Sequence, residues 1–218
     1  MRIVGLTGSI GMGKSTAAAM LRRLGLPVHD ADAAVHRLME KGGGAVAAVE
    51  AAFPGVARDG AVDRRLLAAR VLRDDRAMKR LESILHPLVR AEALAFLAKQ
   101  ARLRRPLAVL DIPLLFETGG ERLCDAVIVV TAPPFVQRLR VLRRPGMTEE
   151  KMQSIMARQL PDAEKRRRAD FVVETGLGKL HSLRQLAAIV RLLLRDAGRR
   201  EGVWRPGMAA RGKARGKT

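Results

Sequence analysis

The sequence predicts an α/β fold built on a doubly wound, mainly parallel sheet. First, short apolar segments typical of buried strands alternate with longer segments whose apolar residues recur at helical spacing. Second, a glycine-rich stretch, Gly8–Ser15, lies between the first strand and the first helix. Third, carboxylates follow two of the strands, at the edge where open parallel sheets bind ligands. A chain of 218 residues, 48% of them hydrophobic, can bury one such domain with inserted subdomains.

The first strand is expected at Ile3–Leu6, before a glycine-rich turn and a helix that begins near Lys14. The stretch Gly8–Ser15, G-S-I-G-M-G-K-S, fits the phosphate-binding pattern G-x-x-x-x-G-K-[ST] at every fixed position. In such a loop backbone N–H groups converge on a triphosphate, a lysine reaches the β and γ phosphates, and a hydroxyl ligates Mg²⁺. A flexible glycine-rich loop is the plain alternative, but the flanking strand and helix favour the phosphate loop. The predicted ATP-binding residues of the loop are Gly8, Gly11, Met12, Gly13, Lys14, Ser15 and Thr16.

The second strand is expected at Leu26–His29, after a first helix that ends at Gly25. This strand runs into Asp30 and Asp32. Asp32 could face the ligand crevice at the strand end, or it could cap a helix that starts next, since aspartate is a favoured N-cap. Asp30 is equally open to a structural role.

Residues 33–105 are predicted to form a mostly helical insert. Apolar residues from Met78 to Leu88 keep one helical face, and glycines 42–44 mark a loop. The dipeptide His86-Pro87 predicts a kink or the start of a new helix, because proline disfavours the α conformation in the residue before it.

The alternation of strands and helices continues beyond the insert. A strand at Leu107–Ile112 is apolar until Asp111 and breaks at Pro113, while Ala126–Val130 is short and β-branched enough to be a fully buried strand. The remaining elements, in order, are a helix from Pro133-Pro134 that carries Arg138, Arg140, Arg143 and Arg144, a helix from Thr148 to about Leu160, the basic run Lys165–Arg168, a strand at Phe171–Val173 and an amphipathic helix over Leu183–Leu194.

The net charge of +19 raises the question of nucleic-acid binding. Aromatic residues make up only 3% of the chain, with no tyrosine, which argues against a stacking platform for bases. An enzyme that handles polyanionic nucleotides also benefits from positive potential, so charge alone does not choose. Residues 199–218 lack periodicity and are rich in Gly, Lys and Arg, and we expect a disordered basic tail there.

The single cysteine, Cys124, cannot form an internal disulfide, which suits a reducing compartment. The N-terminal apolar stretch is too short for a signal peptide, and no apolar stretch approaches the length of a membrane span. We therefore expect a cytoplasmic protein without a membrane partner.

Several motifs, taken in their order along the chain, resemble the dephospho-CoA kinase family. They are L-T-G-S-I-G-M-G-K-S-T at 6–16, D-A-D at 30–32, H-P at 86–87, D-I-P-L-L-F-E at 111–117, Gln137 with Arg140 and Arg144, and K-x-x-x-A-D at 165–170. The resemblance covers nearly the whole chain up to about residue 198. It implies a P-loop NTPase fold in which 1–198 form one kinase domain, with a helical substrate-binding insert at about 33–105 and a helical lid at about 144–168. It also implies transfer of the ATP γ-phosphoryl group to the ribose 3′-hydroxyl of dephospho-CoA, the final step of coenzyme A biosynthesis.

The resemblance further implies roles for individual residues. The catalytic set is Asp32, which would accept or orient the hydroxyl proton, with Lys14 and Arg140. Arg140 and Arg144 stand four apart, which predicts one helix face and, with Lys165, a lid over ATP; a solvated basic face is the alternative. Ser15 and Asp111 are the predicted Mg²⁺ residues. Besides Asp32, the implied substrate-binding residues are His86, which could equally be structural, Pro113, Leu114, which could be plain core, and Glu117, which could instead brace its own turn.

One departure from the family pattern lies at Glu174-Thr175-Gly176, where many members carry an asparagine-containing turn near the adenine. The departure leaves recognition of the base by a side chain of this turn open, and backbone contacts could serve instead. The sequence leaves two other functions open. One is a P-loop kinase of another small molecule, a nucleoside monophosphate or a sugar acid. The other is a P-loop protein whose basic tail binds nucleic acid.

Overall fold

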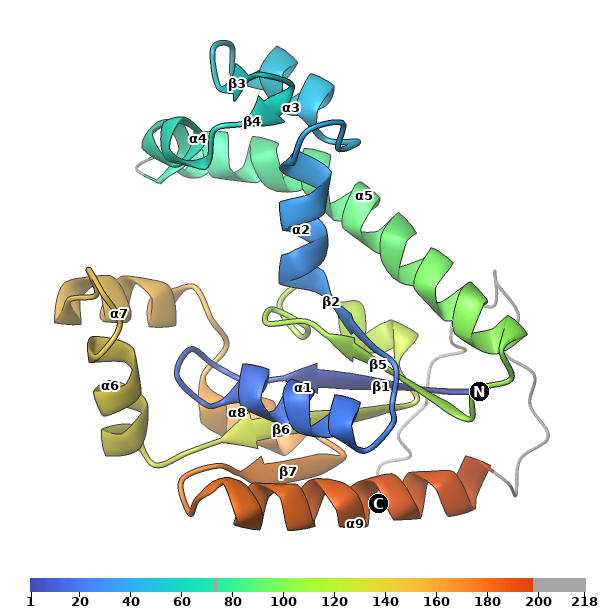
Figure 1. Ribbon diagram of the computed structural model, residues 1–218. Helices are drawn as coiled ribbons and strands as arrows, with labels where there is room; N and C mark the ends of the chain where they lie inside the picture. The colour runs from blue at the N-terminus through green and yellow to red at the C-terminus, as the bar shows by residue number, and fades with distance from the viewer. Residues whose placement is uncertain (73, 198–218) are drawn as a thin grey trace, which may run out of the picture. The chain divides into compact units, whose positions relative to one another are not determined.

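A five-stranded sheet forms the core of one part of the chain in the computed structural model, which describes residues 1–72 and 74–197 (Figure 1). The strand order is β2-β5-β1-β6-β7, and β1 pairs in parallel with both β5 and β6. The last strand pairs in parallel with β6. These registers confirm the predicted parallel sheet. The strands are β1 Arg2–Thr7, β2 Val28–Asp30, β5 Leu107–Asp111, β6 Ala126–Thr131 and β7 Phe171–Glu174.

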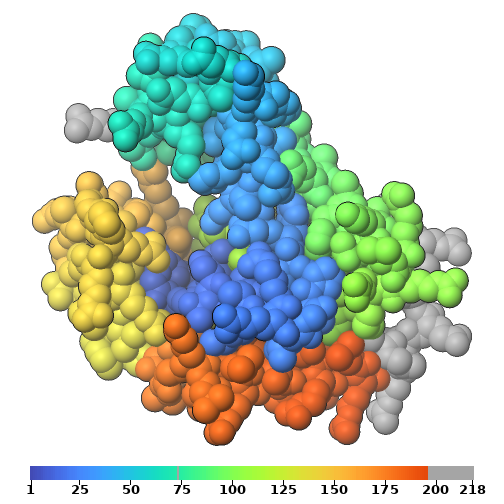
Figure 2. Space-filling model, in the orientation of Figure 1, coloured from blue at the N-terminus to red at the C-terminus, as the bar shows by residue number. Residues whose placement is uncertain are grey.

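Helices cover both faces of this sheet, which makes it doubly wound. On one face, α1 and α9 lie side by side, as the adjoining blue and orange-red atoms in Figure 2 show. They cover a buried cluster that includes Leu6, Leu21, Ile128 and Leu186. On the other face, Val127 and neighbouring β6 residues pack under the segment that follows β5. Because β6 is buried on both faces, it needs a continuous apolar run rather than an alternating one. The helices of this part are α1 Lys14–Arg23, α6 Pro134–Leu142, α7 Glu149–Ala157, α8 Asp162–Arg168 and α9 Lys179–Ala197, with a 3₁₀ turn, η1, at Gly120–Leu123.

The chain divides into two compact units, one formed by residues 1–29 and 98–197 and the other by residues 30–97. The second unit has its own core, in which Leu38, Val49, Val56, Leu67 and Leu85 are buried. Its elements are α2 Ala31–Met39, α3 Val46–Ala52, β3 Ala57–Arg58, β4 Ala61–Val62, α4 Arg64–Val71 and α5 Asp75–Arg102.

Three details of this second unit differ from or sharpen the expectations. A two-stranded antiparallel hairpin, β3–β4, interrupts the predicted helical block. Asp59 and Gly60 turn it, with φ angles of 51° and 81° that aspartate and glycine tolerate. Pro87 does not start a new helix, since α5 continues through it from Asp75 to Arg102.

The remaining comparisons concern the ends of helices and the C-terminal part of the chain. Gly25 follows α1 with a φ of 82°, and Thr148 caps α7, as expected. The basic run at 165–168 forms the C-terminal part of a helix, α8. The predicted disordered tail at 199–218 lies outside the described residues. No helix within 1–72 and 74–197 is both long and apolar enough to span a bilayer.

Candidate active site

The glycine-rich loop between β1 and α1 has the backbone of a phosphate cradle. Gly11 and Gly13 take φ angles of 78° and 86°, which only glycine adopts without strain. Gly8 lies so close to β6 that an added Cβ would be 2.5 Å from Val130 Cγ2 and 2.7 Å from Val130 O. These three positions therefore require glycine for conformation or for space.

The N-terminus of α1 presents backbone donors toward the loop. Its N-cap, Gly13, provides no side-chain oxygen, and the first helical bond is that of Ala17 N–H to Gly13 O. The N–H groups of Lys14, Ser15 and Thr16 precede that bond, and no capping side chain satisfies them. Together with the helix dipole, such donors form an anion site.

Lys14 lies between this cradle and the neighbouring strand. Its Nζ is 2.7 Å from Asp111 Oδ1, and the two side chains are 14% and 2% exposed. The pairing follows from topology, because the parallel strands β1 and β5 end side by side, with Leu6 opposite Asp111. The structure thus brings together two of the predicted site residues, a phosphate-binding lysine and a buried carboxylate.

Two glutamines hold the backbone of Ile10 in the loop. The Ile10 N–H donates to Gln159 Oε1 over 3.0 Å, while Gln137 Nε2 donates to Ile10 O over 2.8 Å. Gln137 belongs to α6, and Gln159 lies just after α7. Helix α6, just before the predicted lid, and the segment that follows α7, within the lid, are therefore both tied to the phosphate loop.

Arg140 and Thr175 tie the far side of the loop to the turn after β7. Arg140 Nη1 donates to Thr175 Oγ1 over 2.9 Å, and its Nη2 donates to Thr175 O over 2.7 Å. The Thr175 hydroxyl in turn donates to Met12 O over 2.8 Å. Met12 contributes only backbone here, because its side chain is buried and its Sδ accepts from Ala132 N.

Arg144 does not share the helix face of Arg140, contrary to the four-residue spacing argument. Helix α6 ends at Leu142, and Arg144 follows in an exposed turn in which its N–H donates to Val141 O. Pro145 and Gly146 come next, and Gly146 takes a φ of 71°. The reason is local, since the residue before a proline disfavours the α conformation.

Lys165 is fully buried and faces Glu117 rather than the phosphate loop. Its Nζ is 2.9 Å from Glu117 Oε1, at angles outside hydrogen-bond geometry, so the attraction is that of an ion pair. The same Glu117 oxygen accepts from Leu160 N over 2.7 Å. Glu117 therefore joins its own segment to α8 and to the residue before Pro161, a contact that the sequence did not predict.

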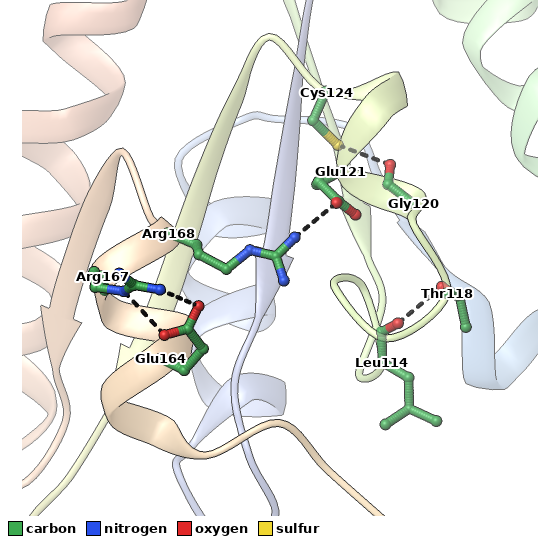
Figure 3. Close-up of polar contacts among 8 residues, drawn as sticks. All are labelled: Leu114, Thr118, Gly120, Glu121, Cys124, Glu164, Arg167 and Arg168. Carbon is green, nitrogen blue, oxygen red and sulfur yellow. Dashed lines mark hydrogen bonds and ion pairs between the residues drawn. The ribbon is translucent and has the colours of Figure 1, made fainter. Parts of the chain in front are cut away.

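A second contact joins the same two elements. Arg168 Nη2 is 2.9 Å from Glu121 Oε1 of η1, as Figure 3 shows, and its guanidinium lies 4.6 Å from the centroid of the Phe116 ring. Arg167, by contrast, pairs with Glu164 of its own helix (Figure 3). Lys165 and Arg168, one turn apart, thus attach α8 to the segment that follows β5.

The D-I-P-L-L-F-E segment carries two more of the predicted substrate residues. Pro113 O accepts from Thr7 Oγ1 over 2.9 Å, which fixes the ends of β5 and β1 to each other. Leu114 O accepts from Thr118 Oγ1 over 2.8 Å, closing a turn (Figure 3). Both residues are half-buried, so part of each remains open to a ligand.

In the second unit, Asp30 rather than Asp32 caps the helix. Asp30 Oδ1 accepts from Ala33 N over 3.0 Å, and α2 begins at the next residue. Asp32 lies exposed in the first turn of α2. Its alternative role as N-cap is thereby excluded. His86 is exposed on the surface of α5.

Comparison with known proteins decides the family. The family model described as dephospho-CoA kinase matches residues 2–178. The chain belongs to the dephospho-CoA kinase family. A dephospho-CoA kinase from Paramagnetospirillum magneticum is 64% identical over 193 residues, covering 88% of this chain and 91% of that one. The dephospho-CoA kinase from Mesorhizobium japonicum is 60% identical over 190 residues, covering 87% and 95%. Among solved structures, TT1252 from Thermus thermophilus aligns with a TM-score of 0.76 at 38% identity, covering 88% of this chain and 96% of that one.

Membership of the dephospho-CoA kinase family agrees with the sequence resemblance and with the P-loop α/β fold. Two contacts of the site were not predicted from the sequence. Gln159 was expected only as part of the helix from Thr148 to about Leu160, and Thr175 was noted as a departure from the family turn. Thr175 is flanked by a strand end and a glycine, a position where a short hydroxyl side chain readily bonds to nearby backbone.

Proposed function

We propose that the protein transfers the γ-phosphoryl group of ATP to the ribose 3′-hydroxyl of dephospho-CoA, the final step of coenzyme A biosynthesis. The observation that carries the proposal is the complete phosphate loop, with Lys14 beside Asp111, in a chain that the dephospho-CoA kinase model matches over residues 2–178. A P-O bond to the β-phosphate breaks, a bond to the 3′-oxygen forms, and the hydroxyl loses its proton. We assign the protein to the cytoplasm, because the reaction consumes ATP and a chain with a single cysteine cannot form an internal disulfide.

The donor side of the reaction belongs to the phosphate loop. The backbone N–H groups at the start of α1 bind the β and γ phosphates, and Gly8, Gly11 and Gly13 allow their approach. Lys14 exchanges its partner Asp111 for phosphate oxygens when ATP arrives. Its positive charge then offsets the charge of the transferring group.

Residues of the donor side also fit Mg²⁺. The described side chains contain no cluster of three or more His, Cys, Asp or Glu that could hold a metal alone. Mg²⁺ in P-loop enzymes needs fewer protein ligands, since phosphates and water complete its octahedral shell. The exposed Ser15 hydroxyl and the Asp111 carboxylate, buried at the loop lysine, are the oxygens that would hold it. When bound, Mg²⁺ neutralises phosphate charge.

The acceptor side begins with Asp32. Its carboxylate is exposed in the first turn of α2, with the helix cap already supplied by Asp30. We assign Asp32 to accept the proton of the 3′-hydroxyl or to orient that hydroxyl for attack. Pro113 and Leu114, half-buried after β5, and His86 on α5 are assigned to contact the acceptor.

The lid residues divide into two groups. Arg144, exposed after α6, and Arg140, which already contacts Gly11 O and Thr175, are assigned to the bound nucleotide. Buried Lys165 is assigned to hold Glu117 in place. Lys165 and Glu117 would then position the segments around the site without contacting the ligand. A lid that excludes water protects the phosphoryl group from hydrolysis.

An acceptor screen tests the proposal. Purified protein with ATP and Mg²⁺ is offered dephospho-CoA, a nucleoside monophosphate, shikimate and gluconate, and the phosphorylated products are identified by mass. We expect phosphorylation of dephospho-CoA at the 3′-position and little of the others. Turnover of a nucleotide or sugar acid without turnover of dephospho-CoA would overturn the assignment in favour of the related kinase class.

A further inference from the structure

A hydrogen-bonded pair of basic side chains, His36 and Arg64, lies exposed in the unit formed by residues 30–97. Arg64 Nη1 is 3.1 Å from His36 Nδ1. Because the guanidinium has no acceptor, it donates, and the imidazole Nδ1 accepts. In the neutral imidazole this leaves Nε2 carrying the remaining N–H, so the pair presents only donors to the solvent.

The donors of Arg64 are not consumed within the described part of the protein. A guanidinium offers five N–H donors, and the contact to His36 uses one. Arg37, the next basic residue on α2, is by contrast engaged with Glu92 at 2.6 Å. A positively charged fork held in orientation by a neighbouring side chain is the arrangement that binds phosphate oxygens bidentately.

The position of this pair relative to Asp32 indicates which part of a ligand it would contact. Asp32 and His36 stand four residues apart on α2, so they share one helix face with Cβ atoms about 5–6 Å apart. In dephospho-CoA the 3′-hydroxyl and the 5′-diphosphate flank the same ribose ring. A nucleotide whose 3′-hydroxyl meets Asp32 would present its 5′-phosphates about one helical turn away.

We propose that Arg64 and His36 form the subsite for the 5′-diphosphate of the acceptor nucleotide. The inference rests on the proposed function for the identity of that acceptor. Arg64 supplies the charge-assisted bonds, and His36 orients the guanidinium while its Nε2–H donates to the same anion. The subsite selects acceptors that carry a 5′-diphosphate and holds the ribose against Asp32.

Arg64→Ala in the full-length protein tests the subsite, with dephospho-CoA and adenosine as paired ligands in equilibrium titrations. A lost charge-assisted pair corresponds to about 10- to 100-fold weaker dephospho-CoA binding. Adenosine, which lacks the diphosphate, should bind the variant and the wild type equally, and KM for ATP should not change. His36→Phe should weaken dephospho-CoA binding less, since the charge remains.

Arg65→Ala is the matched control, because Arg65 is the next residue of α4 and is equally exposed. It should leave dephospho-CoA binding unchanged. If thermal melting shows that Arg64→Ala unfolds, Arg64→Gln serves instead. Unchanged dephospho-CoA binding, or an equal loss for adenosine, would overturn the subsite. Turnover of dephospho-CoA by the wild type in the same experiment tests the proposed function separately, so the two failures can be told apart.

Discussion

The backbone of Ile10 is held by two glutamines, one of which accepts a hydrogen bond while the other donates one. Gln159 accepts from the N–H of Ile10, whereas Gln137, only 4% exposed, donates to its carbonyl. A glutamate has nearly the same shape as glutamine but accepts only. Replacement by glutamate should therefore be tolerated at Gln159 and should destabilise the protein at Gln137.

Gln159→Glu should leave the melting temperature of the nucleotide-free protein near that of the wild type, because a carboxylate still accepts from Ile10 N. Gln137→Glu loses the donor and buries a charge, so we expect a loss of about 1–3 kcal/mol in the free energy of unfolding. Thermal melting and urea titration of both variants, without nucleotide, measure these two quantities. Equal effects of the two variants would contradict the assignment of donor and acceptor.

Asp32 is the residue on which the acceptor chemistry depends. Asp32→Asn keeps the shape of the side chain but cannot take a proton, so kcat should fall about 100- to 10,000-fold with KM for ATP unchanged. Steady-state kinetics with dephospho-CoA measure both values. Asp59→Asn, at an exposed hairpin position with positive φ that asparagine favours, is the control and should not change kcat. A normal kcat for Asp32→Asn would remove it from the chemistry.

Cys124 illustrates how environment governs a single residue. Burial raises the pKa of its thiol from 9.0 to about 12, and nearby carboxylates add to the rise. The folded protein therefore keeps the proton where the unfolded chain loses it, so the contribution to stability is full below pH 9 and falls as pH rises toward 12. An aromatic disulfide reagent at pH 8 should react slowly with native protein and rapidly in urea. Equally fast reaction in both would contradict the burial.

At the scale of elements, α8 depends on a buried ion pair. Lys165 is fully buried, whereas the Glu117 side chain is 16% exposed. Lys165→Met therefore leaves a partly solvated carboxylate without its cation, which should cost about 1–3 kcal/mol. The double variant Lys165→Met with Glu117→Gln should regain most of this, because glutamine is neutral and still accepts from Leu160 N. Arg167→Met is the control, since Arg167 is 77% exposed and pairs within its own helix. Chemical denaturation gives the midpoints of all three variants. If Lys165→Met is as stable as the Arg167→Met control, the ion pair does not stabilise α8.

Elements with strong local signals were predictable from the sequence. The apolar run of β6, the cap Thr148 and the Pro134 start of α6 each carry their physical cause within a few residues. The hairpin at Ala57–Val62 was missed because each of its strands has only two residues, too few to show a period of two. The 28-residue α5 was divided because Pro87 locally opposes a helix that apolar packing on both sides sustains.

Site residues, like the helices and strands, were predictable where their signal is local in the sequence. The phosphate loop was predictable because its spacing encodes its own conformation, and Asp111 because it ends an apolar strand. Contacts across long sequence separations were not, such as Lys165 with Glu117 or Thr175 with Met12. Those depend on how α8 and β7 pack on the sheet. The face shared by Arg140 and Arg144 was wrongly expected, because the helix ends between them.

At the scale of the whole molecule, the net charge of +19 acts on substrates that are themselves polyanions. KM for ATP and for dephospho-CoA should rise with KCl as ions screen this field, while kcat changes little. Residues 199–218 hold seven basic and one acidic residue, so their removal lowers the charge considerably. Kinetics of the 1–198 protein should show unchanged kcat and a weaker dependence of KM on salt. Loss of kcat on truncation would instead give the tail a part in the chemistry.

The half-buried thiol of Cys124, with its raised pKa, has a practical consequence for the study of motion in this kinase. The sequence contains no other cysteine, so this weakly reactive thiol is the only native group that competes for thiol-directed probes. Cysteines introduced at two exposed positions, as Arg70→Cys on α4 and Met156→Cys on α7, would carry a donor and an acceptor dye without altering the wild-type background. Energy transfer between the dyes would then follow the separation of the two units through a catalytic cycle, one molecule at a time.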